Sequence, residues 1–183
     1  FAKNLGVVDG DVKVMEQEIK LSLTQEVEKR VKADLKKQVF QLLIDSHDME
    51  IPKSLVTMEV NRMMQSTYEN LKKQGADMKE VKLEKEMFEE TAIKTCKLRI
   101  ILATLVDENK LEASEEQIKL KVTEFSANFD DTEKAEKWFY DDPKRLDEPA
   151  ALSTEDNIVD WFLKECKIES KKVSFDELMA MQV

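Results

Sequence analysis

Histidine chemistry in this chain would depend on His47, because the sequence of 183 residues contains a single histidine. His47 stands in the tetrapeptide Asp-Ser-His-Asp, residues 45–48, whose residue types compete for backbone hydrogen bonds and tend to end helices. The tetrapeptide does not match any known pairing of a cysteine or serine nucleophile with a histidine base. We therefore predict no catalytic residue and no enzymatic activity for this chain.

Metal and cofactor sites are not indicated either. Zinc sites need clustered cysteine and histidine ligands, whereas Cys96 and Cys166 lie far apart in the sequence. Three glycines are too few for a glycine-rich loop that binds a dinucleotide or a phosphate. We predict no metal and no cofactor, and we expect both thiols to be reduced and buried. Three acidic pairs are more typical of solvated helix faces than of general acids: Glu89 and Glu90, Glu115 and Glu116, Asp130 and Asp131.

Methionine is the residue type whose number and spacing indicate a function. Of the nine methionines, Met58, Met63 and Met64 fall within one expected helix, and Met78 and Met87 lie near the helix that would face it. Methionine adapts to many apolar shapes and is frequent at binding surfaces of broad specificity. Ordinary core packing between the two hairpin helices is the alternative, and it is the commoner role of such methionines. A two-helix arm has too little neighbouring structure to cover all its apolar residues, which favours a binding surface.

Aromatic residues extend this argument to a second part of the chain. Phe125, Phe129, Trp138 and Phe139 either form another binding surface or close a small core of their own. The spacing fits both alternatives. Our candidate contact residues for an apolar partner are Met58, Met63, Met64, Tyr68, Met87, Phe88, Phe125, Phe129, Trp138 and Phe139.

The element around which the chain is organised is a predicted helix over residues 12–44, which contain no glycine and no proline. Apolar residues recur there at every fourth position. At about 1.5 Å per residue the helix is about 50 Å long, more than the width of a small domain. Four residues overshoot one turn by about 40°, so the apolar stripe winds around the helix, and we expect its two halves to be buried against different neighbours. The stripe consists of Met15, Ile19, Leu23, Val27, Val31, Leu35, Val39 and Leu43.

A helical hairpin is predicted to follow. Pro52 suits the first position of a helix, and Gly75 is well placed to end it. A further long helix over residues 83–109 would then fold back on the first.

Shorter helices are predicted for the C-terminal half. The sequences Ser-x-x-Gln at 114–117 and Ser-x-x-Glu at 174–177 are capping boxes, which mark helix starts. Another short helix is expected over residues 132–139. Residues 143–149 hold two prolines and predict an irregular or short helical turn, followed by a helix around 153–166.

Together these elements predict an all-α fold, with an elongated multi-helix body built on one long N-terminal helix and two protruding helical arms. Residues 1–10 are expected to be a linker remnant, with Asp9 or Asp11 capping the long helix. The predicted helical domain over 11–183 comprises the long helix at 11–48, a first arm at 49–111, a second arm at 112–152, and C-terminal helices at 153–183 that return to the body.

The charge of the chain excludes some partners. Charged residues make up 37% of the sequence, and the formal net charge of −10 would repel nucleic acid. No stretch approaches the roughly 18 apolar residues of a membrane span, and no secretory signal opens the sequence. We expect no nucleic-acid partner, no membrane partner and a reducing, cytoplasmic location.

Several segments together carry a resemblance to a known family. Residues 50–56 and Glu59 match an Ile-Pro-x-x-Leu-Val/Ile-x-x-Glu pattern. The match continues through Phe88-Glu89-Glu90, the apolar run 100–106 with Asn109-Lys110-Leu111 after it, and Phe175-Asp176-Glu177-Leu178-Met179. In order and spacing these segments resemble bacterial trigger factor over essentially the whole chain.

The resemblance implies the C-terminal chaperone domain of that family, an all-helical body with two arms around a cradle that holds unfolded chains without ATP. Unfolded or nascent polypeptides are then the expected partners, and a homodimer stays open. Full-length members also carry a ribosome-docking domain and a peptidyl-prolyl isomerase domain of the FKBP type upstream. We therefore expect ribosome contact only through those upstream parts.

We accordingly expect an ATP-independent chaperone domain that binds unfolded or nascent polypeptide through distributed apolar contacts and limits aggregation. The alternative is a passive helical scaffold or dimerisation module, in which the same apolar stripes would meet one fixed protein partner.

Overall fold

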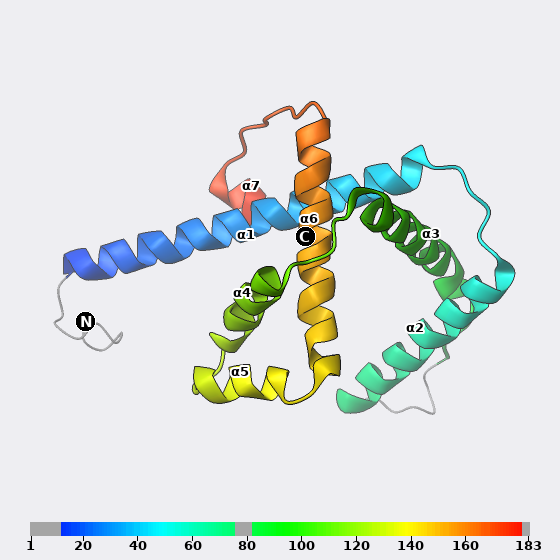
Figure 1. Ribbon diagram of the computed structural model, residues 1–183, viewed down its shortest axis with the longest axis horizontal. Coiled ribbons are helices and arrows are strands. Elements are labelled where there is room, and N and C mark those ends of the chain that lie inside the picture. The colour runs from blue at the N-terminus through cyan, green and yellow to red at the C-terminus, as the bar shows by residue number, and fades with distance from the viewer. Residues whose placement is uncertain (1–11, 76–81, 181–183) are drawn as a thin grey trace. The chain divides into compact units, whose positions relative to one another are not determined.

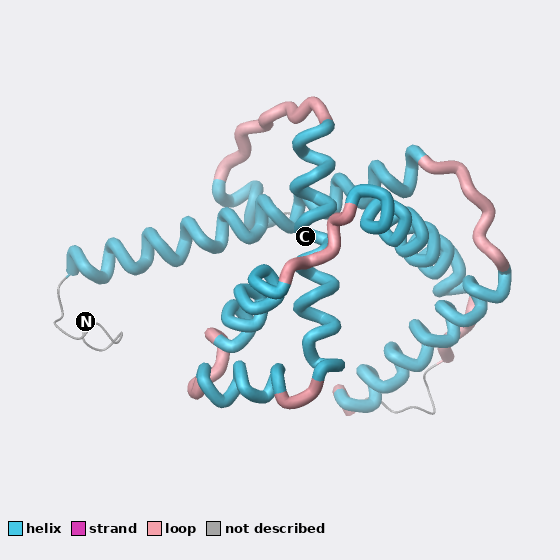
Figure 2. Tube along the Cα trace, viewed as in Figure 1, coloured by secondary structure: helices cyan, strands magenta, loops and turns pink. Residues whose placement is uncertain are grey.

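The computed structural model describes residues 12–75 and 82–180, and every regular element within these ranges is helical (Figure 1, Figure 2). The prediction of an all-α fold is therefore confirmed. The chain divides into two compact units, one formed by Phe1–Val39 with Cys166–Val183 and the other by Phe40–Glu165.

The helices account for most of the described residues. The linker remnant predicted at 1–10, the capping residues Asp9 and Asp11, and Met78 lie outside the described residues. The elements are α1 (Val12–Ser46), α2 (Lys53–Lys73), α3 (Glu86–Asn109), α4 (Glu115–Ser126), α5 (Thr132–Tyr140), a 3₁₀ turn η2 (Pro143–Leu146), α6 (Asp147–Glu165) and α7 (Phe175–Ala180).

Helix α1 is the predicted long N-terminal helix, and its 35 residues confirm that prediction. The absence of glycine and proline explains its length. At its end, the Ser46 hydroxyl lies 3.3 Å and the His47 Nδ1 2.8 Å from the carbonyl oxygen of Leu43. These contacts satisfy a carbonyl that has no partner within the helix.

The apolar stripe of α1 differs in exposure along its length. Val39 and Leu43 are buried, with 5% and 3% of their surface exposed. Ile19, Leu23 and Val31 are 48%, 46% and 41% exposed. The prediction that both halves are buried is therefore wrong for Ile19 and Leu23 of the first half and for Val31 of the second, because periodicity identifies an apolar face but not the neighbour that would cover it.

In the unit Phe40–Glu165, α2 and α3 pack against each other as the predicted hairpin (Figure 1). Pro52 precedes α2, and its carbonyl accepts hydrogen bonds from the backbone N–H groups of Leu55 and Val56. Gly75 follows α2 at φ +80°, a left-handed conformation that glycine adopts without strain. Ala92 and Cys96 of α3 are buried, and the Cys96 thiol donates to the Leu55 carbonyl at 3.7 Å.

Helix α4 packs against α5 and α6 in the same unit. Its predicted capping box is present: the Ser114 hydroxyl accepts from the Gln117 N–H at 3.3 Å, and the Gln117 side chain accepts from the Ser114 N–H at 2.9 Å. Val122 of α4 and Ile158 of α6 are almost completely buried and belong to the core of this part of the chain.

A polar network holds the connection between α3 and α4 against α6. Asn157 donates to the carbonyl of Leu111 at 3.1 Å and accepts from the Gln117 side chain at 2.6 Å. The Ala113 N–H donates to the Thr154 hydroxyl at 3.1 Å. A connection without regular structure thus has its backbone groups satisfied by side chains of α6.

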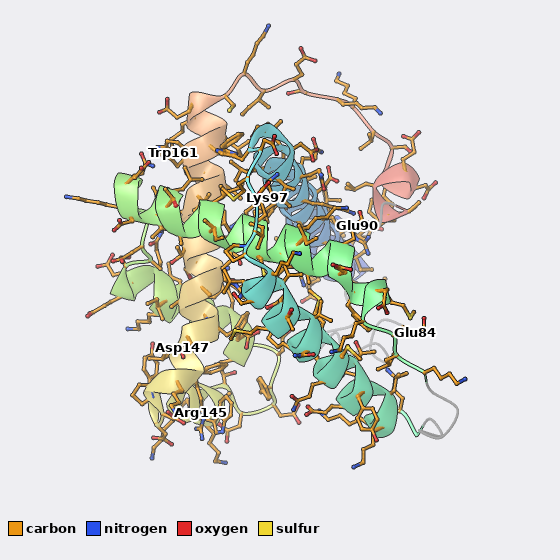
Figure 3. The ribbon with its side chains drawn as sticks, turned by 90° about the vertical axis from the view of Figure 1, so that its right-hand side faces the viewer. Glu84, Glu90, Lys97, Arg145, Asp147 and Trp161 are labelled. Atoms are coloured by element: carbon orange, nitrogen blue, oxygen red, sulfur yellow. The ribbon has the colours of Figure 1, made fainter. Side chains whose placement is uncertain are left out.

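Helix α6 begins at Asp147, several residues before the start expected near residue 153. Pro149 lies in its first turn, where backbone N–H groups have no acceptor within the helix, so proline is tolerated there. The preceding Pro143 opens the 3₁₀ turn η2. Figure 3 labels Asp147 and Trp161 toward opposite ends of α6.

In the other unit, α7 packs on α1. The predicted capping box is present, with the Ser174 N–H donating to the Glu177 carboxylate at 2.8 Å and the Glu177 N–H to the Ser174 hydroxyl at 3.3 Å. Leu178 is buried, and the Arg30 guanidinium donates to the Met179 carbonyl at 3.2 Å. A six-residue helix needs such tertiary contacts, because it is too short to be stable alone.

The two cysteines have different surroundings. Both are free thiols, and Cys96 is buried while Cys166, just after α6, is exposed. The expectation that both are buried is therefore wrong for Cys166.

Candidate functional site

The candidate residues of the α2/α3 hairpin differ widely in exposure. Met58 and Met87 are 68% and 67% exposed, and Tyr68 is 47% exposed. Met63, Met64 and Phe88 are partly exposed. The hairpin therefore leaves several large apolar side chains in contact with solvent, as expected for two helices with few other neighbours.

Three of these residues share one groove. Met63 of α2 lies together with Met87 and Phe88 of α3 around a space of about 410 Å³. We call this space the hairpin groove; its remaining lining residues are Arg62, Ser66, Thr67 and Thr91.

The other candidates on α2 point elsewhere. At about 100° per residue, Met58 lies about 140° around the helix from Met63. Tyr68 lies one helical turn after Met64, so these two side chains share a side of α2 that is turned away from Met63. The sequence-predicted hairpin residues therefore do not form a single patch.

A charged cluster borders the hairpin groove. The Glu59 carboxylate is buried and accepts hydrogen bonds from Arg62 Nε at 3.0 Å, Arg62 Nη2 at 2.5 Å and Arg99 Nη2 at 3.1 Å. The Arg62 hydrogen bond is the main cause that holds the pKa of Glu59 below its ordinary value; burial opposes it and Arg99 assists it. Glu59 is thus a paired, charged link between α2 and α3.

Sequence reasoning gave Glu59 no role beyond its place in the family pattern. The signal that could have identified Glu59 is its position on the apolar side of α2. It follows Val56 by three residues and precedes Met63 by four.

Helix α5 carries the second group of candidates. Phe139 is 8% exposed, its ring centroid lies 6.0 Å from that of Phe125, and its ring meets Trp138 edge to face at 5.2 Å. Phe129 and Trp138 are 59% and 53% exposed. Phe139 therefore belongs to a small core, as one of the two alternatives expected, whereas Phe129 and Trp138 face solvent and their part in a binding surface stays a prediction.

Phe129, Trp138 and Phe139 line a pocket of about 490 Å³, which we call the α5 pocket. Its rim is charged, with Asp130, Asp131 and Lys134 among the lining residues. Asp131 caps α5 by accepting from the Lys134 N–H at 3.1 Å, and the Lys134 side-chain hydrogen bond is the main cause that lowers the Asp131 pKa.

Arg145 fixes the position of Trp138. Its guanidinium carbon lies 4.2 Å from the ring centroid of Trp138, and its Nη1 donates to the Trp138 carbonyl at 2.6 Å. The hydrogen bond to the backbone carbonyl holds the guanidinium in place, and the cation over the aromatic face restricts the indole. The exposed Trp138 is therefore a held side chain rather than a freely rotating one.

A third apolar groove, of about 440 Å³, lies on the unit that contains α7. Ile19, Leu23 and Val27 of α1 and Phe175 of α7 provide its apolar lining. None of the contact residues predicted from the sequence lies here, because this part of the stripe was expected to be buried. The sequence signal for this groove was that Phe175 lies in a predicted helix too short to cover the apolar stripe of α1.

Catalytic chemistry is not suggested by the described residues. The His47 ring contacts the end of α1 through the Leu43 carbonyl. Within residues 12–75 and 82–180, no group of three or more His, Cys, Asp or Glu residues is arranged to hold a metal ion. Among the helices described, none has the length and apolarity required to cross a membrane.

Comparison with known proteins assigns the family. A family model described as the C-terminus of bacterial trigger factor protein matches residues 11–164. The chain belongs to the trigger factor family.

Whole-chain relatives agree with this assignment. The trigger factor of Methylobacillus flagellatus is 49% identical over 179 residues, which is 98% of this chain and 41% of that protein. The trigger factor of Laribacter hongkongensis is 42% identical over 180 residues, again 98% of this chain and 41% of the relative. That of Chromobacterium violaceum is 37% identical over 182 residues, or 100% of this chain and 42% of the relative. The chain therefore spans about two fifths of the length of these trigger factors.

Proposed function

We propose that this chain is an ATP-independent chaperone domain that binds unfolded or nascent polypeptide and limits its aggregation. Membership of the trigger factor family supports the chaperone class. The observation that carries the binding mechanism is the exposure of Met58, Met87, Phe129 and Trp138, whose side chains are between 53% and 68% exposed.

Exposed apolar side chains provide the driving force for client binding. Burial of apolar surface contributes about 25 cal/mol per Å², so one methionine or tryptophan covered by a client contributes on the order of 1–3 kcal/mol. A client held by a single contact of this size dissociates easily, whereas several such contacts together retain it. Separate contact points also suit unfolded clients, because a flexible polypeptide reaches several of them without one fixed shape.

The groups of contact residues are proposed as follows. The hairpin groove forms one client surface, and the α5 pocket with Phe125 beneath it forms another. Met58, Met64 and Tyr68 add separate contact points on other sides of α2. Phe139 supports the second surface from within the core. In this proposal the hairpin belongs to a first arm at 49–111, and α4 and α5 belong to a second arm at 112–152.

The net charge serves the same function. A formal charge of −10 keeps chaperone–client complexes apart by mutual repulsion, so a bound client is less able to meet another exposed chain. We place this activity in the reducing cytoplasm, and we assign any ribosome contact of the family to parts outside this chain.

The alternative function is a helical scaffold or dimerisation module with one fixed partner. The specific observation that favours it is the exposed run of Ile19, Leu23 and Val31 on α1, since an apolar stripe on one helix suits a complementary surface of one partner. This alternative predicts that one particular protein, or a second copy of the chain, saturates binding at a fixed stoichiometry. It also predicts that unfolded clients do not bind.

The proposed function is tested by light scattering of a chemically denatured client diluted into buffer without nucleotide. We expect scattering to fall as the chain is added over a stoichiometric series. Met87→Asp and Trp138→Asp should each weaken this suppression with helicity retained, because each places a charge where a client would be buried. Leu120→Asp is the matched control, since Leu120 is 66% exposed on α4 outside both surfaces. Unchanged scattering at every ratio would refute the proposal.

A further inference from the structure

Building on the proposed function, we infer that the thioethers of Met58 and Met87 are oxidation sites that regulate client binding at the hairpin. A neutral hydroperoxide, such as hydrogen peroxide, converts them to sulfoxides, which weakens the client contacts of the hairpin and leaves the α5 pocket in use. The inference rests on the exposure of these two side chains, on the place of Met87 in the hairpin groove, and on the different composition of the α5 pocket.

Two methionines of the described residues differ from the others in exposure. Met58 is 68% and Met87 is 67% exposed. The other methionines within residues 12–75 and 82–180 are only partly exposed: Met15, Met49, Met63, Met64 and Met179. An oxidant must reach the sulfur to react with it, so Met58 and Met87 should be modified first.

The oxidation itself needs no other group of the protein. A lone pair of the sulfur attacks one oxygen of hydrogen peroxide, and the S–O bond forms as the O–O bond breaks. The departing hydroxide takes the proton of the transferred oxygen and leaves as water. The sulfur thereby gives up two electrons, which the peroxide accepts. The product is a sulfoxide, which is polar where the thioether was apolar.

The charge around Met87 determines which oxidant suits it. Glu84, Glu86, Glu89 and Glu90 are exposed on both sides of Met87 in the sequence, and Figure 3 labels Glu84 and Glu90. These carboxylates repel an anionic oxidant, whereas they exert no net repulsion on an uncharged one. A neutral hydroperoxide is therefore the oxidant class that we assign to this site.

A sulfoxide at Met87 changes the hairpin groove at the place that a client would cover. Met63, Met87 and Phe88 give the groove its apolar lining. A client side chain that covers the sulfoxide must displace water from a polar group, and it also loses an apolar contact. Arg62 and hydroxyl groups of the lining are donors that can pair with the new oxygen, so we expect client binding to weaken severalfold rather than to vanish.

The α5 pocket lacks this sensitivity. Its apolar lining consists of aromatic rings together with Ala135, and no methionine is among the described residues that line it. An aromatic ring has no thioether sulfur to attack a peroxide. Mild oxidation should therefore separate the two client surfaces, because it alters the hairpin and spares Phe129, Trp138 and Phe139.

The test uses the whole chain with the change Cys166→Ser, because the exposed Cys166 thiol would also react with peroxide. The chain is treated with limiting hydrogen peroxide, the reaction is stopped with catalase, and the oxidised methionines are identified by peptide mass mapping. Binding of a fluorescent unfolded client, reduced and carboxymethylated α-lactalbumin, is then measured by anisotropy, and helicity by circular dichroism.

We expect Met58 and Met87 to be oxidised before Met63 and Met64, and the client to bind about three- to tenfold more weakly at unchanged helicity. Methionine sulfoxide reductases for both sulfoxide epimers, with dithiothreitol as reductant, should restore the affinity. The indole N–H NMR signal of Trp138 should still respond to client in the oxidised chain.

Two variants separate the hairpin methionines from the rest, each compared with its own untreated sample. The double variant Met58→Leu with Met87→Leu keeps apolar side chains of similar volume but has no sulfur there, so peroxide should leave its affinity unchanged. The matched control is Met49→Leu, since Met49 is partly exposed and lies outside both client surfaces. This control should lose affinity on oxidation as the parent chain does.

An oxidised chain that binds the client as tightly as the untreated chain would overturn the inference. So would an equal loss of affinity in the double leucine variant, or a loss that parallels a fall in helicity. Oxidation of Met63 and Met64 ahead of Met58 and Met87, or a Trp138 signal that no longer responds to client, would also count against it. Failure of the untreated chain to bind the client removes the proposed function instead.

Discussion

The link between α2 and α3 through Glu59 predicts a specific loss of stability in the Glu59→Gln variant. Glutamine keeps the shape of glutamate but removes the charge, and its amide nitrogen cannot accept a hydrogen bond. In the native chain three N–H groups donate to this carboxylate. The change therefore weakens every one of these bonds and leaves one amide NH₂ facing a guanidinium group.

The magnitude follows from the exposure of the partners. Hydrogen bonds to charged groups contribute about 1.5–3 kcal/mol each when buried. Arg62 and Arg99 are 62% exposed, so water replaces much of what they lose, and burial of Glu59 has its own desolvation cost. We expect a total loss of about 1–2 kcal/mol in the free energy of unfolding at neutral pH.

The pH dependence identifies the cause. The pKa of Glu59 in the folded chain is lowered from 4.5. Its stabilising contribution is therefore fully present above that value and is lost as pH falls through the folded pKa, when the carboxylate becomes protonated. The difference between the native chain and Glu59→Gln should shrink toward acidic pH.

The assay is urea unfolding followed by circular dichroism, at neutral pH and in steps below pH 4.5. The matched control is Glu90→Gln on α3, where Figure 3 labels Glu90. The Glu90 side chain is 81% exposed and pairs with Lys94 of the same helix at 2.6 Å. This control should change stability very little. A Glu59→Gln variant as stable as the native chain, or a difference that does not shrink in acid, would refute the reasoning.

Three further predictions concern the α4–α6 region. Ser114→Ala removes the cap of α4 and should cost about 0.5–2 kcal/mol in urea unfolding, with the conservative Ser114→Thr close to the native value. Asn157→Leu leaves the Leu111 carbonyl without its side-chain donor and should cost about 1–3 kcal/mol; hydrogen exchange should then rise selectively in residues 110–117, and no change there would count against the network. Arg145→Ala releases Trp138, so acrylamide should quench its fluorescence more strongly in a Trp161→Phe background, whereas unaltered quenching would contradict the role of Arg145.

Local sequence signals predicted the helices well. The four-residue apolar repeat and the lack of glycine and proline were enough to predict α1, and two capping boxes marked the starts of α4 and α7. Such signals act within a few residues, so they are visible without tertiary structure. The early start of α6 was missed because proline was taken as a break, although it is tolerated in the first turn of a helix.

Burial could not be predicted in the same way. Periodicity places Phe129, Trp138 and Phe139 near one another, but it does not tell which ring is covered, since that depends on Phe125 and Arg145 from other elements. Likewise, Arg99 is far from Glu59 in the sequence, so their pairing cannot be inferred from helical spacing.

Client contact itself is tested most directly by NMR of the whole chain during titration with an unfolded polypeptide. We predict that the methyl signals of Met58, Met63 and Met87 and the indole N–H signal of Trp138 shift or broaden as client is added. The indole of Trp161, on α6 and outside both proposed surfaces, should change little. Binding that leaves Trp138 and these methionines unperturbed would contradict the proposal that exposed apolar residues of the hairpin and α5 hold the client.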